Sequence, residues 1–579
     1  MSLQHDVADR LEELANLLEA DHVEYKPNAY RRAAESVRDY QGSFDDLVAE
    51  GPEAVDELPH VGDAISSKIV EYAETGSIAE LDAYRERYPV ELDALLRVEG
   101  VGPKTVGTLY DELEIETLAD LESAARDGKI RELHGFGAKT EQNILEHIEF
   151  ARSAGERSLL GDARPVADGV VDHLSGASPV EAVEVAGSLR RWRETIGDVD
   201  VLVATDDGEA TIDSFTGWEE TDEVIEAGTE KASVWSDGMR VDLRVVVPDE
   251  FGSALQYFTG SKAHNVALRN YAIERGLKLN EYGAFDVSDV VDPDAGQRVG
   301  DRVAGESEES MYEALDLPWI PPEMREDRGE IAAAAEDDLP DLLTLDDVRG
   351  DLHVHTDWSD GKAPIEEMLS GAAAYGHDYV AITDHATGPG VVGGMGLPDE
   401  ELLEQVDAVR AAAESADVTA FTGVEANVTA DGEVSVADEV LAELDVVVAS
   451  PHAALDGDGT DRLVRAMEHP AVDVLGHPTG RLLNQRPGLD VDAERLARVA
   501  VEEGVALEVN SNPHRLDLDG GPVKAAIDAG ATIVVDTDAH HPSSYELVRY
   551  GVHTARRGWA ETADVLNTWD TDAVGDFLH

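Results

Sequence analysis

The spacing of apolar residues changes along the chain. From residue 1 to about 150 they recur at helical intervals, as in LEELANLLEA, between short turns that contain glycine. From 151 to about 325, strand-like and helix-like stretches alternate. From 347 to 579, short apolar runs such as YVAIT, VVVAS and VALEVN alternate with helical stretches, which predicts β/α repeats around a parallel, barrel-like sheet.

Three segments of the helical region share one design, a glycine turn followed by a helix. Glycine permits a tight turn at a helix start, where backbone N–H groups can meet a DNA phosphate. The design resembles the helix-hairpin-helix, with His60 in place of the first glycine of the first copy. Any one copy could be a structural helix cap, but three in series favour binding of the DNA backbone. The segments are LPHVGDAISSKIVEY (58–72), VEGVGPKTVGTLYDEL (98–113) and LHGFGAKTEQNILEHI (133–148), with candidate contacts Gly100, Gly102, Lys104, Gly135, Gly137 and Lys139.

Three aspartates in the middle region form a candidate metal site. Asp198 and Asp200 lie two apart on a predicted strand and therefore share a face. Asp242 lies in the apolar strand RVDLRVVV, where an unpaired charge would be costly. Three carboxylates can hold two divalent ions that activate a 3′-hydroxyl and stabilise a leaving pyrophosphate. The alternative is a set of surface acids on a strand edge.

The stretch AGSLRR, just upstream, predicts a strand, a glycine turn and a helix start. Ser188, Arg191 and the backbone N–H groups of this turn could hold a triphosphate, and Gly197 would let it approach.

Residues 1–325 resemble a family X DNA polymerase, on the helix-hairpin-helix pattern and on GSLRR, GDVD, VDLR, YFTGSKAHN and NEYGAF. The resemblance implies that the three aspartates bind Mg²⁺ or Mn²⁺, and that Ser188, Arg191 and Gly197 contact the nucleotide phosphates. It also implies a sugar pocket, a contact to the nascent base pair and a template side. The sugar pocket falls on Tyr257, Phe258 and Gly260, and the contact to the base pair falls on Asn265. The template side falls on Arg269, Asn280, Glu281 and Tyr282.

The same family often removes a 5′-deoxyribose phosphate through a Schiff-base lysine in its first domain. That lysine falls on Lys68, with Lys26 and Tyr30 in matching places. A nucleophilic lysine needs a lowered pKa, normally with the help of nearby cations. Ala64 and Asp63 stand close to Lys68 where the family has a more basic pocket, so a simple phosphate contact is the alternative role.

The stretch DLHVHTDWSDG (351–361) opens the C-terminal region with a second candidate metal site. On a strand, His353 and His355 project to one side, and Asp360 follows in the loop. Further ligand types follow other apolar runs, where β/α barrels place their active sites. A polar surface strand and a structural zinc site are the alternatives. The nine candidates are His353, His355, Asp360, His385, Glu425, His452, His477, Asp538 and His540.

Residues 350–579 resemble a PHP (polymerase and histidinol phosphatase) domain, and the whole order resembles the bacterial and archaeal family X polymerases that carry one. The resemblance implies up to three Mn²⁺ or Zn²⁺ ions and hydrolysis of a phosphodiester. Arg515, in LEVNSNPHRLDL, could grip a phosphate near the barrel mouth.

Composition limits the cellular setting. The chain has 123 acidic and 45 basic residues and a net charge of −78, spread along its whole length. Such acidity usually argues against a nucleic-acid partner, because phosphate binding relies on Lys and Arg. In molar salt, however, a Debye length of ~3 Å screens the repulsion, so a DNA partner stays open and a halophilic archaeal source is expected.

No apolar run approaches the ~20 residues that span a membrane, and the first twenty residues are amphipathic rather than signal-like. We therefore expect a cytoplasmic protein. The chain has no cysteine, so any metal must be held by His and carboxylates.

Together these patterns predict a multidomain α+β and α/β protein with a helical N-terminus, a nucleotidyltransferase palm with thumb, and a distorted PHP β/α barrel. The expected partners are gapped or nicked DNA and dNTPs, with no membrane, and the expected state is a monomer. The expected activity is a gap-filling repair DNA polymerase with a metal-dependent 3′–5′ exonuclease or abasic-site endonuclease. The alternative is a DNA-binding scaffold with an idle palm and a phosphatase for small phosphate esters. The predicted domains are a lyase-like domain 1–85, fingers 86–150, palm 151–258, thumb 259–325, linker 326–346 and PHP domain 347–579.

Overall fold

The computed structural model describes residues 3–23, 25–38, 40, 44–49, 51–56, 58–98, 100–154, 157–293, 295–390 and 395–578. The chain divides into two compact units, which are treated separately below. The first is Met1–Arg157 with Asn484–Arg486, and the second is Ser158–Leu483 with Pro487–His579. In the described part of the chain, no helix is both long and apolar enough to cross a bilayer.

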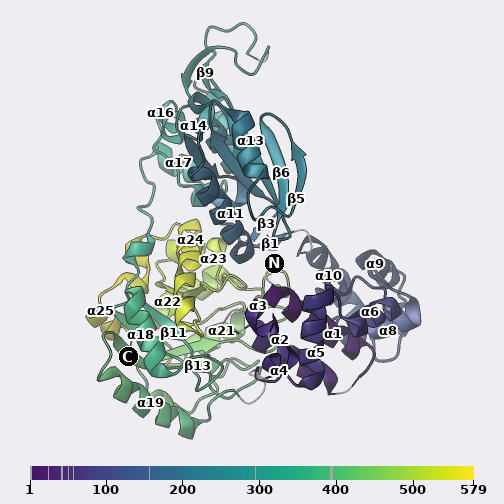
Figure 1. The fold of residues 1–579 in the computed structure, drawn as a ribbon. Helices are drawn as coiled ribbons and strands as arrows, with labels where there is room; N and C mark the ends of the chain where they lie inside the picture. Colours follow the sequence, from purple (N-terminus) through teal and green to yellow (C-terminus); the bar gives the residue numbers. More distant parts are fainter. Residues whose placement is uncertain are drawn as a thin grey trace. The chain divides into compact units, whose positions relative to one another are not determined.

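The first unit is built from helices around one aliphatic core, drawn in purple to dark blue in Figure 1. Apolar side chains of α1, such as Leu11, Leu14 and Leu18, are fully buried in that core, as the helical spacing predicts. The helices are α1 (Leu3–Ala20), α2 (Lys26–Arg38), α3 (Phe44–Ala49), α4 (Pro52–Val55), α5 (Asp63–Thr75), α6 (Ala79–Arg87), α7 (Leu92–Leu96), α8 (Pro103–Leu113), α9 (Leu118–Arg126) and α10 (Ala138–Ala154).

Three of these helices begin with the predicted glycine turns. Gly100 and Gly135 take φ values of +81° and +90°, the left-handed region that favours glycine. His60 takes the same conformation in the first copy, with φ of +61°. The substitution therefore leaves the turn geometry intact, with an exposed histidine in the conformation that the motif gives to glycine.

The second unit opens with a five-stranded sheet in the order β2-β4-β7-β6-β5. Strands β4 and β7 run parallel at its centre, and the other pairs are antiparallel. Helices α11 and α13 pack on this sheet. The elements are β1 (Ser158–Leu159), α11 (Leu160–Ser175), β2 (Ala182–Val185), α12 (Gly187–Arg190), β3 (Thr195–Ile196), β4 (Val199–Ala204), α13 (Gly208–Thr216), β5 (Glu223–Ala227), β6 (Lys231–Ser236) and β7 (Met239–Val246).

A smaller α/β layer follows. Its three strands form an antiparallel sheet in the order β10-β9-β8. Its buried core includes Leu268, Met311 and Tyr312. The elements are α14 (Phe251–Thr259), α15 (Lys262–Ile273), β8 (Leu277–Asn280), β9 (Gly283–Asp286), β10 (Asp301–Ala304) and α16 (Glu308–Glu313).

The segment 326–346, predicted as a linker, is packed chain. It contains helix α17 (Glu330–Ala335), and Leu343 is fully buried against the barrel that follows. Glu330 is also buried, paired with His264 of α15. An Ala- and acid-rich composition predicts a solvated connection, but the buried Glu330–His264 pair and Leu343 anchor this one.

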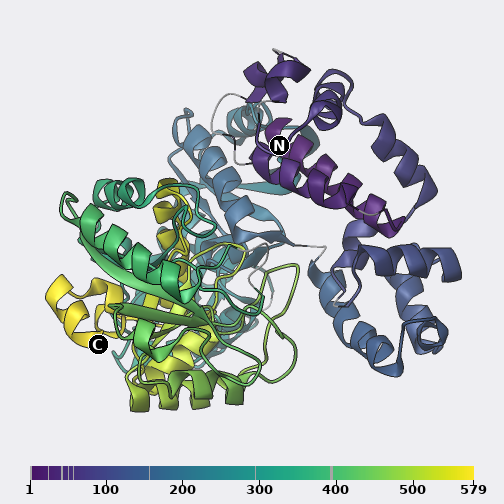
Figure 2. The ribbon, with the colours of Figure 1, turned by 90° about the horizontal axis from the view of Figure 1, so that it is seen from below.

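Seven parallel strands in sequential order, β11 to β17, make the C-terminal barrel. It is nearly closed, because Val354 at the end of β11 bridges Ala539 after β17, and His355 N donates to Ala539 O at 2.8 Å. In Figure 2 the strands of this green-to-yellow part lie inside its helices. The strands are buried on both faces, which explains their near-continuous apolar runs.

The barrel strands are β11 (Gly350–Val354), β12 (Tyr379–Ile382), β13 (Thr419–Asn427), β14 (Val446–Ser450), β15 (Val474–Leu475), β16 (Ala506–Asn510) and β17 (Ile533–Asp536). The helices are α18 (Ile365–Tyr375), α19 (Asp399–Ala413), α20 (Asp438–Leu441), α21 (Thr460–Met467), α22 (Ala493–Glu503), α23 (Gly520–Asp528), α24 (Val548–Arg557) and α25 (Thr571–Phe577).

The five-stranded sheet and the barrel share an apolar core. Leu483, Leu516 and Tyr550 of the barrel belong to the same buried cluster as the residues of β4 and α11. Gly161 of α11 approaches Pro513 so closely that a Cβ at Gly161 would lie 2.5 Å from the proline side chain. The two sheets therefore form one continuous body.

Candidate active sites

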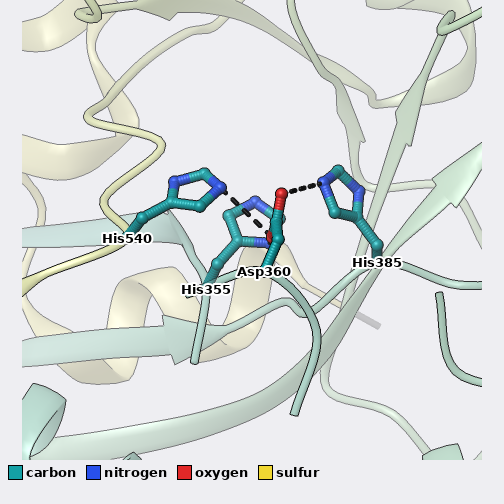
Figure 3. A group of neighbouring side chains, drawn as sticks. All are labelled: His355, Asp360, His385 and His540. Carbon is teal, nitrogen blue, oxygen red and sulfur yellow. Dashed lines mark ion pairs between the residues drawn. The ribbon is translucent and has the colours of Figure 1, made fainter. Parts of the chain in front are cut away.

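The barrel brings all nine of its predicted ligand residues together at the carboxyl ends of its strands. His353 and His355 stand at the end of β11, and the others follow or end later strands. Figure 3 shows His355, Asp360, His385 and His540 pointing toward one another, with Asp360 between two imidazoles. Three overlapping groups of ligand atoms arise: His355, Asp360, His385 and His540; His353, His355 and Glu425; and His385, Glu425 and His452.

The two remaining candidates adjoin these groups. His477 Nε2 lies 2.8 Å from Oε1 of Glu425, and Asp538 Oδ1 lies 3.2 Å from Nε2 of His355. All nine predicted residues therefore lie in one cluster. Their role as metal ligands stays a prediction.

Several polar atoms of this cluster are buried without a hydrogen-bond partner within the described residues. Buried polar groups are normally paired, so a concentration of unpaired donors indicates a missing ligand. His385 Nδ1 lies 2.6 Å from Oε2 of Glu425 without hydrogen-bond geometry, as two ligands of one ion would. The donor set of imidazoles and carboxylates fits divalent metals. The unpaired atoms are His353 Nε2, His355 Nδ1 and Nε2, His385 Nδ1, Glu425 Oε2, His452 Nε2 and His477 Nδ1.

The electrostatics of the cluster keep its acids charged. Burial would raise the pKa of Glu425, but His452 and His385 hold it well below its usual range. The pKa of Asp538 is likewise held well below its usual range by His355 and His353, against the effect of burial. Burial lowers the pKa of His355 to about 4, with the neighbouring imidazoles adding to the shift. In contrast, the neighbouring carboxylates raise the pKa of His385 to about 11 and that of His540 to about 9 against the effect of burial, so metal binding would release protons from these imidazoles.

Three residues outside the predicted set orient the ligands. Glu508 Oε1 accepts from His353 Nδ1 at 2.7 Å, and Asn427 Oδ1 accepts from His452 Nδ1 at 2.8 Å. Asp384 accepts from the backbone N of Thr356 at 2.7 Å and so holds the loop that carries Asp360. Such partners fix the ring orientation of metal-binding histidines. The sequence signal for Glu508 was a carboxylate inside the apolar run VALEVN.

Arg515 lies at the rim of this cluster, as predicted for a phosphate contact. Its Nε is 3.6 Å from Oδ2 of Asp538, and its side chain is partly exposed. The loop that carries it is held by Arg481, whose guanidinium donates to the carbonyl of Arg515 at 2.8 Å. A cation in this position could meet an anionic substrate that enters the barrel mouth.

The three aspartates of the five-stranded sheet also come together. Asp200 and Asp242 are register partners on the parallel strands β4 and β7, and Asp198 completes a group of ligand atoms. Burial, reinforced by the charges of Asp198 and Asp242, raises the pKa of Asp200 to about 7. Three carboxylates that repel one another at close range indicate a site for cations.

The glycine turn before β4 packs directly on this triad. Gly187 has φ of +62°, and a Cβ there would lie 2.4 Å from Oδ2 of Asp200, so only glycine lets the backbone approach. Asp242 accepts from Arg240 Nε at 2.9 Å and from the hydroxyl of Ser233. A cavity of about 200 Å³ opens beside the triad, lined in part by Arg244 and Phe258.

The predicted phosphate contacts lie near this turn. Ser188 is in α12 and is half-buried, and Gly197 is exposed next to Asp198. The guanidinium of Arg191 is engaged by protein atoms: it donates to Glu326 Oε1 at 3.0 Å and to the carbonyl of Thr259 at 2.6 Å. The sequence did not indicate this partner for Arg191.

The predicted sugar-pocket residues end helix α14. Tyr257 and Phe258 pack edge to face at 5.1 Å, and Gly260 lies so close to Asn265 that a Cβ would be 2.4 Å from Oδ1. Asn265 Nδ2 donates to the carbonyl of Tyr257 at 2.7 Å. The structure thus brings these four residues together.

The predicted template-side residues lie on α15 and around the turn between β8 and β9. Asn280 ends β8, Glu281 and Tyr282 form the turn, and the Tyr282 ring lies 3.7 Å from the guanidinium of Arg298. Arg269 is exposed on α15, and its guanidinium lies 6.0 Å from the Tyr257 ring. Their contact with DNA stays a prediction.

In the first unit, Lys68 has an acidic partner that the sequence did not indicate. Its Nζ lies 3.1 Å from Oε2 of Glu80 and donates to the carbonyl of Ala64 at 3.2 Å. Burial alone would lower the pKa of Lys68, but the bond to Glu80 raises it overall. The predicted neighbours are present, with Lys26 Nζ 3.7 Å from Glu80 and the Tyr30 ring 6.0 Å from Nζ. A raised pKa is the opposite of what a Schiff-base lysine needs.

The glycine turns of the first unit leave their backbone open. Among the residues that the structure describes, a Cβ at Gly100, Gly102, Gly135 or Gly137 would meet nothing within 4 Å. Lys104 and Lys139, just inside the following helices, are both exposed. Open helix starts flanked by lysine are suited to a phosphate, and the DNA contact of these residues stays a prediction.

Comparison with known families assigns four stretches of the chain. A helix-hairpin-helix domain matches residues 3–78, and a SAM-like helix-hairpin-helix tandem matches 92–149. The DNA polymerase beta thumb matches 254–326, and the PHP domain matches 351–512. These matches and the seven-stranded parallel barrel confirm the predicted fold class.

Individual proteins extend the similarity. The DNA polymerase/3'-5' exonuclease PolX of Bacillus subtilis is 35% identical over 566 residues, which cover 96% of this chain and 95% of that protein. DNA polymerase lambda of Rattus norvegicus is 26% identical over 344 residues, which cover 55% of this chain and 56% of that protein. DNA polymerase lambda of Arabidopsis thaliana is 25% identical over 305 residues, covering 47% and 54%.

Proposed function

Because the chain belongs to the family X DNA polymerases that carry a C-terminal PHP domain, we propose that it is a DNA-repair enzyme that both extends and trims primers. The polymerase adds dNTPs across short gaps, and the barrel removes nucleotides as a metal-dependent 3′–5′ exonuclease. The observation that carries this proposal is the presence of two ligand clusters in different sheets with no shared residue.

In the palm, the triad Asp198, Asp200 and Asp242 would hold divalent ions, which supply the charge that activates a 3′-hydroxyl and stabilises the leaving group. Gly187 brings the backbone of the preceding turn next to the triad, where its N–H groups can bind a triphosphate. Mg²⁺ or Mn²⁺, two ions, are the proposed metals.

In the barrel, the nine-residue cluster would hold Mn²⁺ or Zn²⁺, which supply a nucleophile at neutral pH. Glu508 and Asn427 keep two imidazoles in fixed orientations, and Arg515 faces the rim, where a scissile phosphate would enter. An abasic-site endonuclease activity of the same site is part of the proposal. A 5′-deoxyribose-phosphate lyase activity of Lys68 is disfavoured, because Glu80 raises the pKa of that lysine.

The competing function, a DNA-binding scaffold with an idle palm, is disfavoured by the assembled triad. The near full-length similarity to a protein named as polymerase and exonuclease supports the enzyme. We further propose gapped or nicked DNA and dNTPs as substrates, a monomeric state and a cytoplasmic location. A halophilic archaeal source, suggested by the net charge of −78, stays a prediction.

The test is incubation of a labelled gapped DNA with the full chain, with and without dNTPs, in Mg²⁺ or Mn²⁺ and at low and molar KCl. We expect extension when dNTPs are present and shortening from the 3′ end when they are absent. A protein that binds the DNA but neither extends nor shortens it would support the scaffold instead.

A further inference from the structure

The end of the thumb and the chain just after it carry three glutamates, each of which binds a different element. Glu323 accepts from His553 Nδ1 at 2.7 Å and from Arg556 Nε at 2.8 Å, both on barrel helix α24. Glu330 lies 2.6 Å from Nδ1 of His264 on α15. Glu326, between them, faces the palm. The segment therefore connects the thumb, the palm and the barrel through buried charges.

Glu326 is shared by arginines of two domains. Its Oε1 lies 3.0 Å from Nε of Arg191 in the palm and 3.4 Å from Nη1 of Arg557 at the end of α24. Arg193 Nη1 stands 3.8 Å from its other oxygen. The side chains of Glu326, Arg191 and Arg557 are only 12%, 13% and 4% exposed. A carboxylate so enclosed by cations stays charged, and these arginines lower its pKa against the effect of burial.

Arg191 directly follows α12, the short helix that starts at the Gly187 turn beside the metal triad, and it opens a second turn. There it would meet the phosphates of an incoming nucleotide. A guanidinium binds carboxylate and phosphate through the same N–H groups and in the same geometry. The Nε that bonds Glu326 therefore cannot also bond a phosphate. A triphosphate that is to bond this Nε must first displace Glu326 from it.

Arg557 is positioned to remain paired with Glu326 after a triphosphate has replaced Glu326 on Arg191. Its Nη1 donates to the carbonyl of Arg191 at 2.9 Å, so it holds the backbone of the turn and the carboxylate together. The next residue of the turn, Trp192, stacks on His553 of α24 at 3.6 Å with ring planes 5° apart. The end of the turn is thus fixed to the barrel, while the Arg191 side chain alone has to move.

We propose that Glu326 competes with the nucleoside triphosphate for Arg191, and that Arg557 of the barrel domain favours polymerisation by drawing Glu326 away. Both are positioning residues, since each acts through Arg191. The inference rests on the proposed polymerase function and extends it: a residue of the nuclease domain sets the affinity of the palm for dNTPs.

The test is steady-state extension of gapped DNA by the full chain, with kcat and the KM for dNTP measured for the wild type, Glu326→Gln, Arg557→Gln and the double variant. Charge-assisted hydrogen bonds of this kind are large enough for about a tenfold change in KM. We expect Glu326→Gln to lower the KM and Arg557→Gln to raise it, with kcat changed much less. In the Glu326→Gln background, Arg557→Gln should have little further effect.

Opposite shifts of the KM in the two variants distinguish this positioning role from a structural one. Damage to the fold would instead lower kcat or raise the KM in both variants. Arg549→Gln is the matched control, an arginine of the same helix that pairs with Asp168 of the palm at 3.5 Å. It should leave both constants unchanged. If Arg557→Gln does not fold, Arg557→Lys replaces it, and its KM should lie between that of the wild type and the raised value expected for Arg557→Gln. An unchanged KM in Glu326→Gln, or a shift of both variants in one direction, would overturn the inference. A wild type that fails to extend primers would instead refute the proposed function.

Discussion

Oε1 of Glu508 lies 2.7 Å from Nδ1 of His353, and the opposite nitrogen of that imidazole, Nε2, is buried in the barrel cluster without a hydrogen-bond partner among the described residues. The carboxylate therefore fixes both the orientation and the tautomer of the ring, and leaves one lone pair directed at the proposed metal.

The first prediction follows from this pair. Glu508→Gln should weaken metal binding by about 10- to 100-fold, the usual cost of removing such a partner. Titration of the metal-stripped chain with Mn²⁺ or Zn²⁺, followed by calorimetry, measures the change independently of activity. Glu503→Gln, an exposed glutamate on α22, is the control and should bind metal normally. Equal affinities in the two variants would contradict the role given to Glu508.

The second prediction concerns His355, which lies within two of the three ligand groups of the barrel. His355→Ala should lose nuclease activity by two or more orders of magnitude, because a displaced ion or misplaced nucleophile is costly. The variant should keep its fold, since the site lies at the rim of an aliphatic barrel, and should still extend primers. Thermal melts beside both assays distinguish this from a structural zinc site, with His469→Ala, a partly buried histidine outside the ligand groups, as the control. A structural zinc site predicts that the barrel unfolds.

The third prediction concerns Asp242 in the palm. Asp242→Ala removes a triad carboxylate that shares no ligand with the barrel, so nucleotide addition should fall by two or more orders of magnitude while nuclease activity persists. Primer extension and primer shortening are scored on the same gapped DNA. Asp213→Ala on α13, at an exposed position, should change neither. Extension by Asp242→Ala at the wild-type rate would show that the triad is not the polymerase site.

The fourth prediction concerns acid stability. Glu308 is buried between Arg325 and Arg190, which lower its pKa from 4.5 to about 2 although burial opposes the shift. Since the folded-state pKa is depressed, its contribution is full above about pH 4.5 and is lost as the pH falls toward 2. The contribution is about 3 kcal/mol at neutral pH.

Glu308→Gln should therefore unfold at lower denaturant concentration at pH 7, and its stability should vary less between pH 5 and 2 than that of the wild type. Denaturant melts across that range measure both effects. Glu309→Gln, the exposed neighbour, should follow the wild-type curve. A pH profile of Glu308→Gln as steep as the wild type would refute the assignment.

The fifth prediction concerns Lys68. Because the bond to Glu80 raises the pKa of Lys68, borohydride trapping of the chain on 5′-deoxyribose-phosphate DNA should be slow near pH 7.5. Glu80→Gln should speed trapping, by about tenfold for each unit by which the lysine pKa falls. Lys68→Ala should abolish trapping in both backgrounds. Rapid trapping by the wild type that Glu80→Gln does not change would show that the ion pair is irrelevant.

The sequence by itself determined the local features of this protein. Turns such as GVG and GFG specify the start of a helix, because few residues other than glycine accept the left-handed backbone they need. Alternation along a strand placed His353 and His355 on one side, and apolar runs on both faces identified a parallel barrel. From these features, the order of motifs identified the family and the nine barrel candidates.

Only the tertiary structure decided which distant charges meet. Glu326 and Arg557 are 231 residues apart and Glu508 is 155 from His353, and no periodicity relates such positions. His60 adopts the glycine conformation, which its residue type does not predict, and Glu80 reverses the pKa shift that a lyase lysine requires. Local patterns fix backbone geometry, but the environment of a charge depends on which parts of the chain pack around it, and that is set only when the whole core forms.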